Sequence, residues 1–215
     1  MNEVHDEYEK VLFLSPHPDD AELGAGGTIA RFIEEGREVY YIVFSICRAS
    51  VPAGLPSDIL KEENLRSCEA LHVLPDRIII LDYEVRTFPT YRQQILDDML
   101  KLKEKIKPDL VLVPSSSDVH QDHNTIYWES LRAFRKEASI WGYEHPWNNL
   151  TFTTDIFIRL KKGHVERKLE ALRQYKSQSN RSYFEERYIR SALTCRGVPV
   201  GWPYAETFEL IRLIL

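Results

Sequence analysis

Two short polar clusters hold the side chains of this chain that are best suited to chemistry. Each follows a strongly apolar run that is typical of a buried strand. The clusters are His17-Pro18-Asp19-Asp20 and His120-Gln121-Asp122-His123. Histidine and carboxylate side chains bind divalent metals and also transfer protons during hydrolysis. The two clusters therefore indicate a metal-dependent reaction centre.

The residues divide into a ligand set and a proton-transfer set. His17, Asp20 and His123 supply two imidazoles and one carboxylate. Such a set leaves a divalent cation with an open position for water or substrate. The remaining side chains are of the types that a hydrolase uses for proton transfer, namely Asp19, His120 and Asp122.

Length and charge limit the class of protein. At 215 residues the chain suits a single α/β domain over residues 1–215. A formal net charge of −5 argues against attraction to nucleic acid or to an anionic membrane. No run approaches the ~18 apolar residues of a membrane span, and the polar, acidic start is unlike a secretory signal. Three widely spaced cysteines indicate reduced thiols, so we expect a cytoplasmic protein.

The order of the predicted elements indicates the fold class. Apolar runs predict strands near 10–15, 38–44, 77–81, 109–114, 154–160 and 206–214. Helical patterns lie near 21–35, 57–73, 91–106, 123–137, 163–176 and 182–192. This alternation favours an α/β fold with a doubly wound, mostly parallel sheet and helices on both faces.

Such a topology would bring the two clusters together. In an open doubly wound sheet, ligands bind beyond the carboxyl ends of the strands, where the strand order reverses. If the order is the common 3-2-1-4, the first and fourth strands are neighbours at that point. His17 follows the first predicted strand and His123 follows the fourth, so we expect them to meet.

Each residue alone also has a plainer explanation. Asp19 or Asp20 could cap the following helix, and any one histidine could be a packed or surface residue. These explanations would have to coincide at two neighbouring strand ends, which favours the metal site. The glycines of residues 24–27 do not form a dinucleotide-binding motif, because position 29 is Ile, and we expect them to let the helix pack tightly on the sheet.

The second half of the chain is less regular. Residues 139–153 hold several aromatic side chains among Pro and Asn breaks, which predict an aromatic loop. Residues 159–190 contain ten basic side chains and four glutamates, which favours the solvated side of two helices. A subunit contact in a homo-oligomer, or a site for an anionic substrate group, is the alternative.

The chain resembles the PIG-L/LmbE-like family of zinc-dependent N-acetylglucosaminyl deacetylases, and the order of its motifs matches over essentially the whole chain. The specific matches are residues 15–24 with 26–30, and residues 118–123. Residues 168–172 with 176–178, and residues 204–208, are supporting matches.

The resemblance implies a Rossmann-like domain in which the ligand set named above holds zinc. It implies that Asp19 is the general base and that His120 assists at the tetrahedral intermediate. We expect a protonated His120 to stabilise the developing oxyanion or to donate a proton to the leaving amine. Asp122 would orient His120. The family's substrate-binding arginine has a candidate match in Arg48.

The expected reaction is the removal of an N-acetyl group from an N-acetylglucosamine-containing small molecule or glycoconjugate. Ferrous iron could replace zinc, since the ligand set suits both metals. A non-haem iron oxygenase uses the same set, but it does not need the additional acid and base side chains. A non-catalytic protein with a structural metal usually closes the site with four ligands, often cysteines, and no cysteine lies near these motifs.

Overall fold

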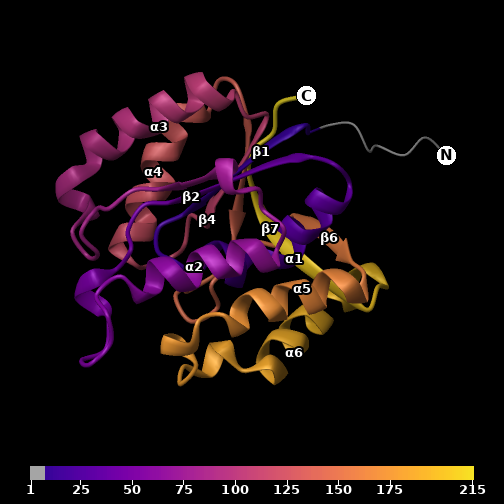
Figure 1. The fold of residues 1–215 in the computed structure, drawn as a ribbon. Helices are drawn as coiled ribbons and strands as arrows, with labels where there is room; N and C mark the ends of the chain where they lie inside the picture. The colour runs from indigo at the N-terminus through magenta and orange to yellow at the C-terminus, as the bar shows by residue number, and fades with distance from the viewer. Residues whose placement is uncertain (1–7) are drawn as a thin grey trace.

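The computed structural model describes residues 8–215, and within them seven strands form one sheet covered by helices on both faces (Figure 1). The strands are β1 (Lys10–Ser15), β2 (Glu38–Val43), β3 (Ile78–Ile80), β4 (Leu110–Pro114), β5 (Ser139–Tyr143), β6 (Ile156–Leu160) and β7 (Tyr204–Arg212). The α-helices are α1 (Asp20–Glu34), α2 (Ile59–Ala70), α3 (Arg92–Ile106), α4 (Gln121–Phe134), α5 (Lys162–Arg173) and α6 (Glu186–Gly197). The predicted α/β fold class is confirmed.

The strand order is β3-β2-β1-β4-β5-β7-β6. β1 pairs in parallel with both β2 and β4, and β7 runs antiparallel to its neighbours β5 and β6. The first four strands therefore have the expected 3-2-1-4 order. The order reverses between β1 and β4, so the loops that leave these two strands flank the switch point.

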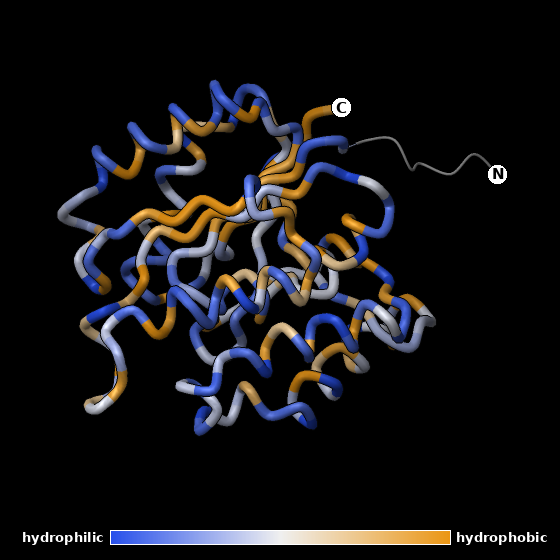
Figure 2. Tube along the Cα trace, in the orientation of Figure 1, coloured by the Kyte–Doolittle hydropathy of each residue, from blue (hydrophilic) through white to orange (hydrophobic). Residues whose placement is uncertain are grey.

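The middle of β1 and most of β4 are apolar because both faces of the sheet are covered there. In β1, Val11 and Phe13 face a core cluster with α1, α2 and α5, whereas Leu12 and Leu14 face a second cluster with α3 and α4. Figure 2 shows the resulting band of hydrophobic strands between more polar helices. Strands of this kind show no polar alternation.

Helix α1 packs closely on the sheet through glycines, as expected from the sequence. A Cβ atom at Gly24 would lie 2.5 Å from Tyr143 Cδ2, and one at Gly27 would overlap Leu160. The close approach fixes the start of α1, which carries Asp20, over the carboxyl end of β1.

The prediction of one aromatic loop over residues 139–153 is wrong in its first third. Ser139–Tyr143 forms the buried strand β5, which pairs with β4 along its whole length. Its five residues include a glycine and a serine, so neither length nor composition marks a strand. Gly142 is needed there because a Cβ atom would lie 2.9 Å from Ser115 Cα.

None of the helices in the described part of the chain has the length and apolar character needed to span a lipid bilayer.

Candidate metal centre and active site

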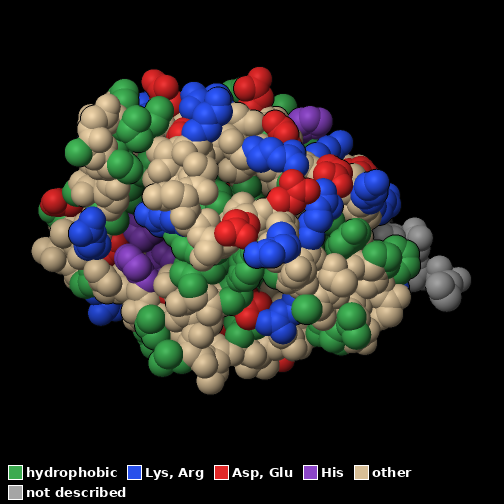
Figure 3. Space-filling view, turned by 90° about the horizontal axis from the view of Figure 1, so that it is seen from below, with side chains coloured by type: hydrophobic (Ala, Val, Ile, Leu, Met, Phe, Trp, Pro, Cys, Tyr) green, Lys and Arg blue, Asp and Glu red, His purple; other side chains and the backbone are tan. Residues whose placement is uncertain are grey.

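The loops that leave β1 and β4 meet at the switch point and form the floor of a pocket. Five of the six predicted metal and proton-transfer residues line it, namely His17, Asp19, Asp20, His120 and His123. The sixth, Asp122, is fully buried behind His17. Figure 3 shows histidine side chains inside a hollow of the surface.

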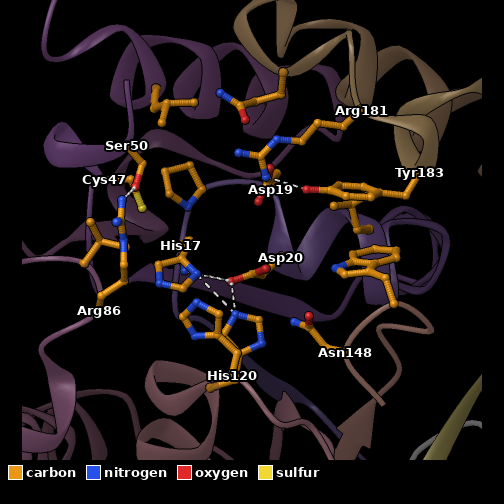
Figure 4. A pocket seen from close by; sticks show the side chains of 17 residues that line it. His17, Asp19, Asp20, Cys47, Ser50, Arg86, His120, Asn148, Arg181 and Tyr183 are labelled. Carbon is orange, nitrogen blue, oxygen red and sulfur yellow. Dashed lines mark hydrogen bonds and ion pairs between the residues drawn. The ribbon is translucent and has the colours of Figure 1, made fainter. Parts of the chain in front are cut away.

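Three side-chain atoms of the predicted ligand set form a nearly equilateral triangle. His17 Nδ1 and His123 Nε2 each lie 3.1 Å from Asp20 Oδ2, and the two nitrogens are 3.2 Å apart (Figure 4). Ligands bound tetrahedrally at about 2.0–2.1 Å from one cation lie roughly 3.3 Å from each other. The triangle therefore has the dimensions of one face of a metal site.

Each imidazole of the triangle is held by a second carboxylate. His17 Nε2 lies 2.9 Å from Asp122 Oδ2, and His123 Nδ1 lies 2.7 Å from Asp118 Oδ2. When these nitrogens donate, the lone pairs of His17 Nδ1 and His123 Nε2 point into the triangle. Metal-binding histidines commonly have this carboxylate support. Asp118 was given no role from the sequence, although it belongs to the same motif as His123.

Other combinations of ligands in the pocket are less suitable. His120 and His145 each lie within reach of some of the same atoms. His120 Nδ1, however, accepts a hydrogen bond from the Asp122 backbone N–H at 3.2 Å, and His145 Nε2 lies 3.0 Å from the Asp20 carbonyl oxygen. His145 Nε2 therefore already has a partner, and His120 can offer only Nε2, whereas the two imidazole nitrogens of the triangle both face Asp20 Oδ2.

His120 contacts Asp122 as expected, but through the backbone N–H of Asp122 in place of its carboxylate, and its charge also differs from the expectation. The Asp122 carboxylate bonds to His17 and to the backbone N–H groups of Arg86 and Phe88, so it does not orient the His120 ring. Burial and the charges of His123 and His17 lower the pKa of His120 to about 4. Because its Nδ1 accepts a hydrogen bond, the neutral ring carries its proton on Nε2.

The cluster of carboxylates favours positive charge at the triangle. Burial lowers the pKa of His123, but the charge of Asp20 and the hydrogen bonds to Asp118 and Asp20 outweigh it and raise the pKa to about 10. The pKa of His17 is also raised, because bonds to Asp122 and Asp20 outweigh its burial. A divalent cation would replace the protons that these rings otherwise hold.

Asp19 lies beside the triangle in an unusual backbone conformation. Its φ is 92°, in the left-handed region, and its side chain makes no capping hydrogen bond to α1. Non-glycine residues in this region are strained and cluster at functional sites. Burial and the charges of Asp20 and Glu22 raise the pKa of Asp19 well above its usual range, while the charge of Arg181 opposes the shift.

The pocket has a volume of about 340 Å³. Its walls include residues for which the sequence predicts no role in the site. On one side, Trp147 stacks on Tyr183 with ring centroids 4.1 Å apart. Arg181 lies on the same side and donates to Tyr183 Oη, and Arg86 lies opposite, next to Ser50 (Figure 4). Trp147 comes from the predicted aromatic loop and Arg181 from the basic stretch, so a composition signal existed for both.

Arg48 does not line this pocket. Its side chain is 52% exposed and forms an ion pair with Asp82 at 2.8 Å on the surface. The structure does not support the expected substrate contact at this position. Arg86 and Arg181 are the two arginines in the pocket wall.

Comparison with known proteins identifies the family. Residues 12–134 match the model of the PIG-L family, described as GlcNAc-PI de-N-acetylase. The match covers more than half of the chain, which therefore belongs to the PIG-L family. The resemblance inferred from the motifs is confirmed.

Individual relatives agree with this assignment. The diacetylchitobiose deacetylase of Thermococcus kodakarensis is 27% identical over 98% of this chain and 86% of its own length. The uncharacterized deacetylase YaiS of Escherichia coli is 29% identical over 78% of this chain and 90% of its own. The solved N,N'-diacetylchitobiose deacetylase of Pyrococcus horikoshii has the same fold, with a TM-score of 0.80 at 23% identity, and the match covers 95% of this chain and 84% of that one.

Proposed function

We propose that this protein is a metal-dependent hydrolase that removes the N-acetyl group from an N-acetylglucosamine-containing small molecule or glycoconjugate. The observation that carries the proposal is the triangle of His17 Nδ1, Asp20 Oδ2 and His123 Nε2 with Asp19 beside it in an open pocket. Membership of the PIG-L family and the relatives named as deacetylases support the reaction class.

The triangle would hold zinc, or ferrous iron, through His17, Asp20 and His123. When bound, such a cation supplies Lewis acidity, which lowers the pKa of a water molecule from about 15.7 toward ~7 and polarises a carbonyl group. Asp118 and Asp122 fix the two imidazoles in the tautomers that this ligation needs.

Asp19 is the proposed general base. Its carboxylate takes a proton from the attacking water and returns it to the amide nitrogen as the C–N bond breaks, which yields acetate and a free amine. Burial raises the pKa of Asp19. The carboxyl group can therefore hold the proton between the attack of water and the cleavage of the C–N bond. A cation at Asp20 would favour the ionised form that starts the cycle.

His120 is the proposed oxyanion donor. With Nδ1 occupied by the Asp122 backbone N–H, the neutral ring presents Nε2–H to the pocket. A fixed N–H donor stabilises the negative charge that develops on the acetyl oxygen during attack. This role replaces the protonated imidazole expected from the sequence.

A panel of N-acetylated sugars tests the proposal. Acetate and free amine should be released in equal amounts from at least one N-acetylglucosamine conjugate. A chelator should stop the reaction, and added zinc or ferrous iron should restore it. Release that is insensitive to metal removal would overturn the mechanism. Oxygen consumption with a 2-oxoacid, in place of acetate release, would support the oxygenase.

A further inference from the structure

The backbone of Arg86 contacts Asp122, which supports the proposed metal centre. Arg86 lies after β3, with a left-handed φ of 71°. Its backbone N–H donates to Asp122 Oδ2 at 2.6 Å, and the same carboxylate oxygen bonds to His17 Nε2. A strained arginine, tied by its backbone to the support of a proposed metal ligand, is held at a fixed place in the pocket.

The guanidinium of Arg86 lacks an acidic partner within residues 8–215. Its Nη2 donates to Ser50 Oγ at 2.9 Å. A guanidinium offers five N–H donors, so most of its capacity is open. Many other arginines in the described part of the chain form ion pairs, for example Arg92 with Glu129 and Arg196 with Glu144. The pocket thus contains a positive charge that the protein itself does not neutralise.

Arg181, the second arginine of the pocket wall, has local partners. It donates to Tyr183 Oη, and its charge acts on Asp19 on the far side of the cavity from Arg86 (Figure 4). Arg86 instead lies beside Ser50 and Cys47. Of the two arginines, Arg86 is therefore the one available to a ligand.

We infer that the substrate carries an anionic group, a carboxylate or a phosphate, which Arg86 binds while the acetamide lies at the triangle. Arginine binds both kinds of group through two parallel N–H donors. Anchoring at Arg86 also keeps the negative charge apart from Asp19 and Asp20. This inference rests on the proposed function and names the substrate class within it.

The test compares anionic with neutral substrates in wild type and in Arg86→Gln. The anionic probes are N-acetylglucosamine 1-phosphate, N-acetylglucosamine 6-phosphate and N-acetylmuramic acid, and the neutral probe is methyl N-acetylglucosaminide. The best anionic probe should exceed the neutral one in kcat/KM by roughly 10- to 100-fold, the range of a charge-assisted hydrogen bond. Arg86→Gln should remove most of that ratio, and Arg48→Gln, a surface arginine outside the pocket, should keep it.

Equal kcat/KM for anionic and neutral sugars, or a ratio unchanged by Arg86→Gln, would overturn the inference. Preference for N-acetylmuramic acid identifies a carboxylate, and preference for a phosphate ester identifies a phosphate.

Calorimetric binding to zinc-loaded Asp19→Asn separates this inference from the proposed function. Suppose that wild type deacetylates none of the sugars, yet the anionic probe binds more tightly than the neutral probe and Arg86→Gln removes this difference. In that case only the proposed reaction is wrong. If anionic and neutral sugars bind equally, the inference fails whatever the reaction.

Discussion

At the scale of single residues, the site depends on which nitrogen of each histidine faces the cavity. Asp122 and Asp118 take one nitrogen of His17 and of His123, and the Asp122 backbone takes Nδ1 of His120. Three histidines in one pocket thereby acquire different properties. Two can coordinate a cation, and the third can donate a hydrogen bond.

The convergence of His17, Asp20 and His123 could be predicted because these residues follow two strands that the topology makes neighbours. The partners of the histidines could not, because they depend on loop conformation. Asp122 lies two positions from His120, yet its carboxylate reaches His17 on another loop. Arg86 was not predicted either, since only the left-handed backbone at that residue brings its N–H to Asp122.

Replacing the proposed base should separate catalysis from metal binding. Asp19→Asn is expected to lower kcat by roughly 10²–10⁴-fold, because the amide cannot accept the proton. Zinc content, measured on the same preparation, should stay at the wild-type level. Asp82→Asn, outside the pocket, is the matched control. An Asp19→Asn enzyme within a few-fold of wild type would disprove the assignment.

His120→Ala should act on the transition state rather than on the metal. Loss of one oxyanion donor is expected to lower kcat by roughly 10²–10³-fold. KM and zinc content should change little, as steady-state kinetics and metal analysis can establish. Loss of zinc from this variant would instead make His120 a ligand.

Metal binding should release protons. Since the pKa of His123 is raised to about 10 and that of His17 is raised as well, both rings bind protons near neutral pH when the cation is absent. A cation needs neutral rings, so its affinity should rise with pH, about tenfold per unit for each proton released. Calorimetry in two buffers of different ionisation enthalpy counts these protons. An affinity that is constant between pH 6 and 8 would contradict this reasoning.

At the scale of elements, helix α1 is held by a buried ion pair. Lys168 Nζ of α5 lies 2.6 Å from Glu206 Oε1 of β7 and donates to the Leu23 carbonyl oxygen at 2.7 Å. Glu206 also accepts the backbone N–H groups of Gly27 and Thr28. The pair connects α1, which begins with Asp20, to two elements from the end of the chain.

This contact gives a physical reason for the two supporting motifs, residues 168–172 and 204–208. The sequence alone could not pair Lys168 with Glu206, because both are of types that usually face solvent. Strand β5 could not be predicted for a similar reason. Its burial comes from its neighbours in the sheet rather than from its own composition.

Removing one charge of the Lys168–Glu206 pair should lower the free energy of unfolding. Lys168→Met leaves the Glu206 carboxylate buried without its cation, which typically costs about 3–5 kcal/mol in the free energy of unfolding. The double variant Lys168→Met/Glu206→Gln removes both charges and should recover part of that loss. Urea unfolding measures each value. Equal stability of Lys168→Met and wild type would show that the pair does not hold α1.

At the scale of the whole molecule, the site brings together residues that follow β1 and β4, the strands on either side of the switch point. The β1–α1 loop supplies His17, α1 begins with Asp20, and α4 supplies His123. A cation held by all three would add a further link between segments that already pair through β1 and β4 and through the contact of His17 with Asp122. The basic stretch is only partly the solvated surface that its composition favoured. Lys168 is buried and Arg181 lines the pocket, whereas Arg190 pairs with Glu166 and Glu186.

Metal removal should therefore destabilise the whole domain. A ligand at about 100 times its Kd adds about 2.7 kcal/mol of stability, and in a domain of this size that corresponds to a Tm change of roughly 5–10 °C. Calorimetry with and without chelator should show this shift in wild type. His123→Ala should show none. A chelator effect of equal size in both proteins would place the stabilising metal elsewhere.

The identity of the metal ligands can be tested directly by anomalous diffraction from zinc-loaded crystals, with data collected on both sides of the zinc absorption edge. We expect one peak in the pocket, within about 2.0–2.2 Å of His17 Nδ1, Asp20 Oδ2 and His123 Nε2. A peak coordinated by His120 or His145 in place of His17, or no peak at this triangle, would contradict it.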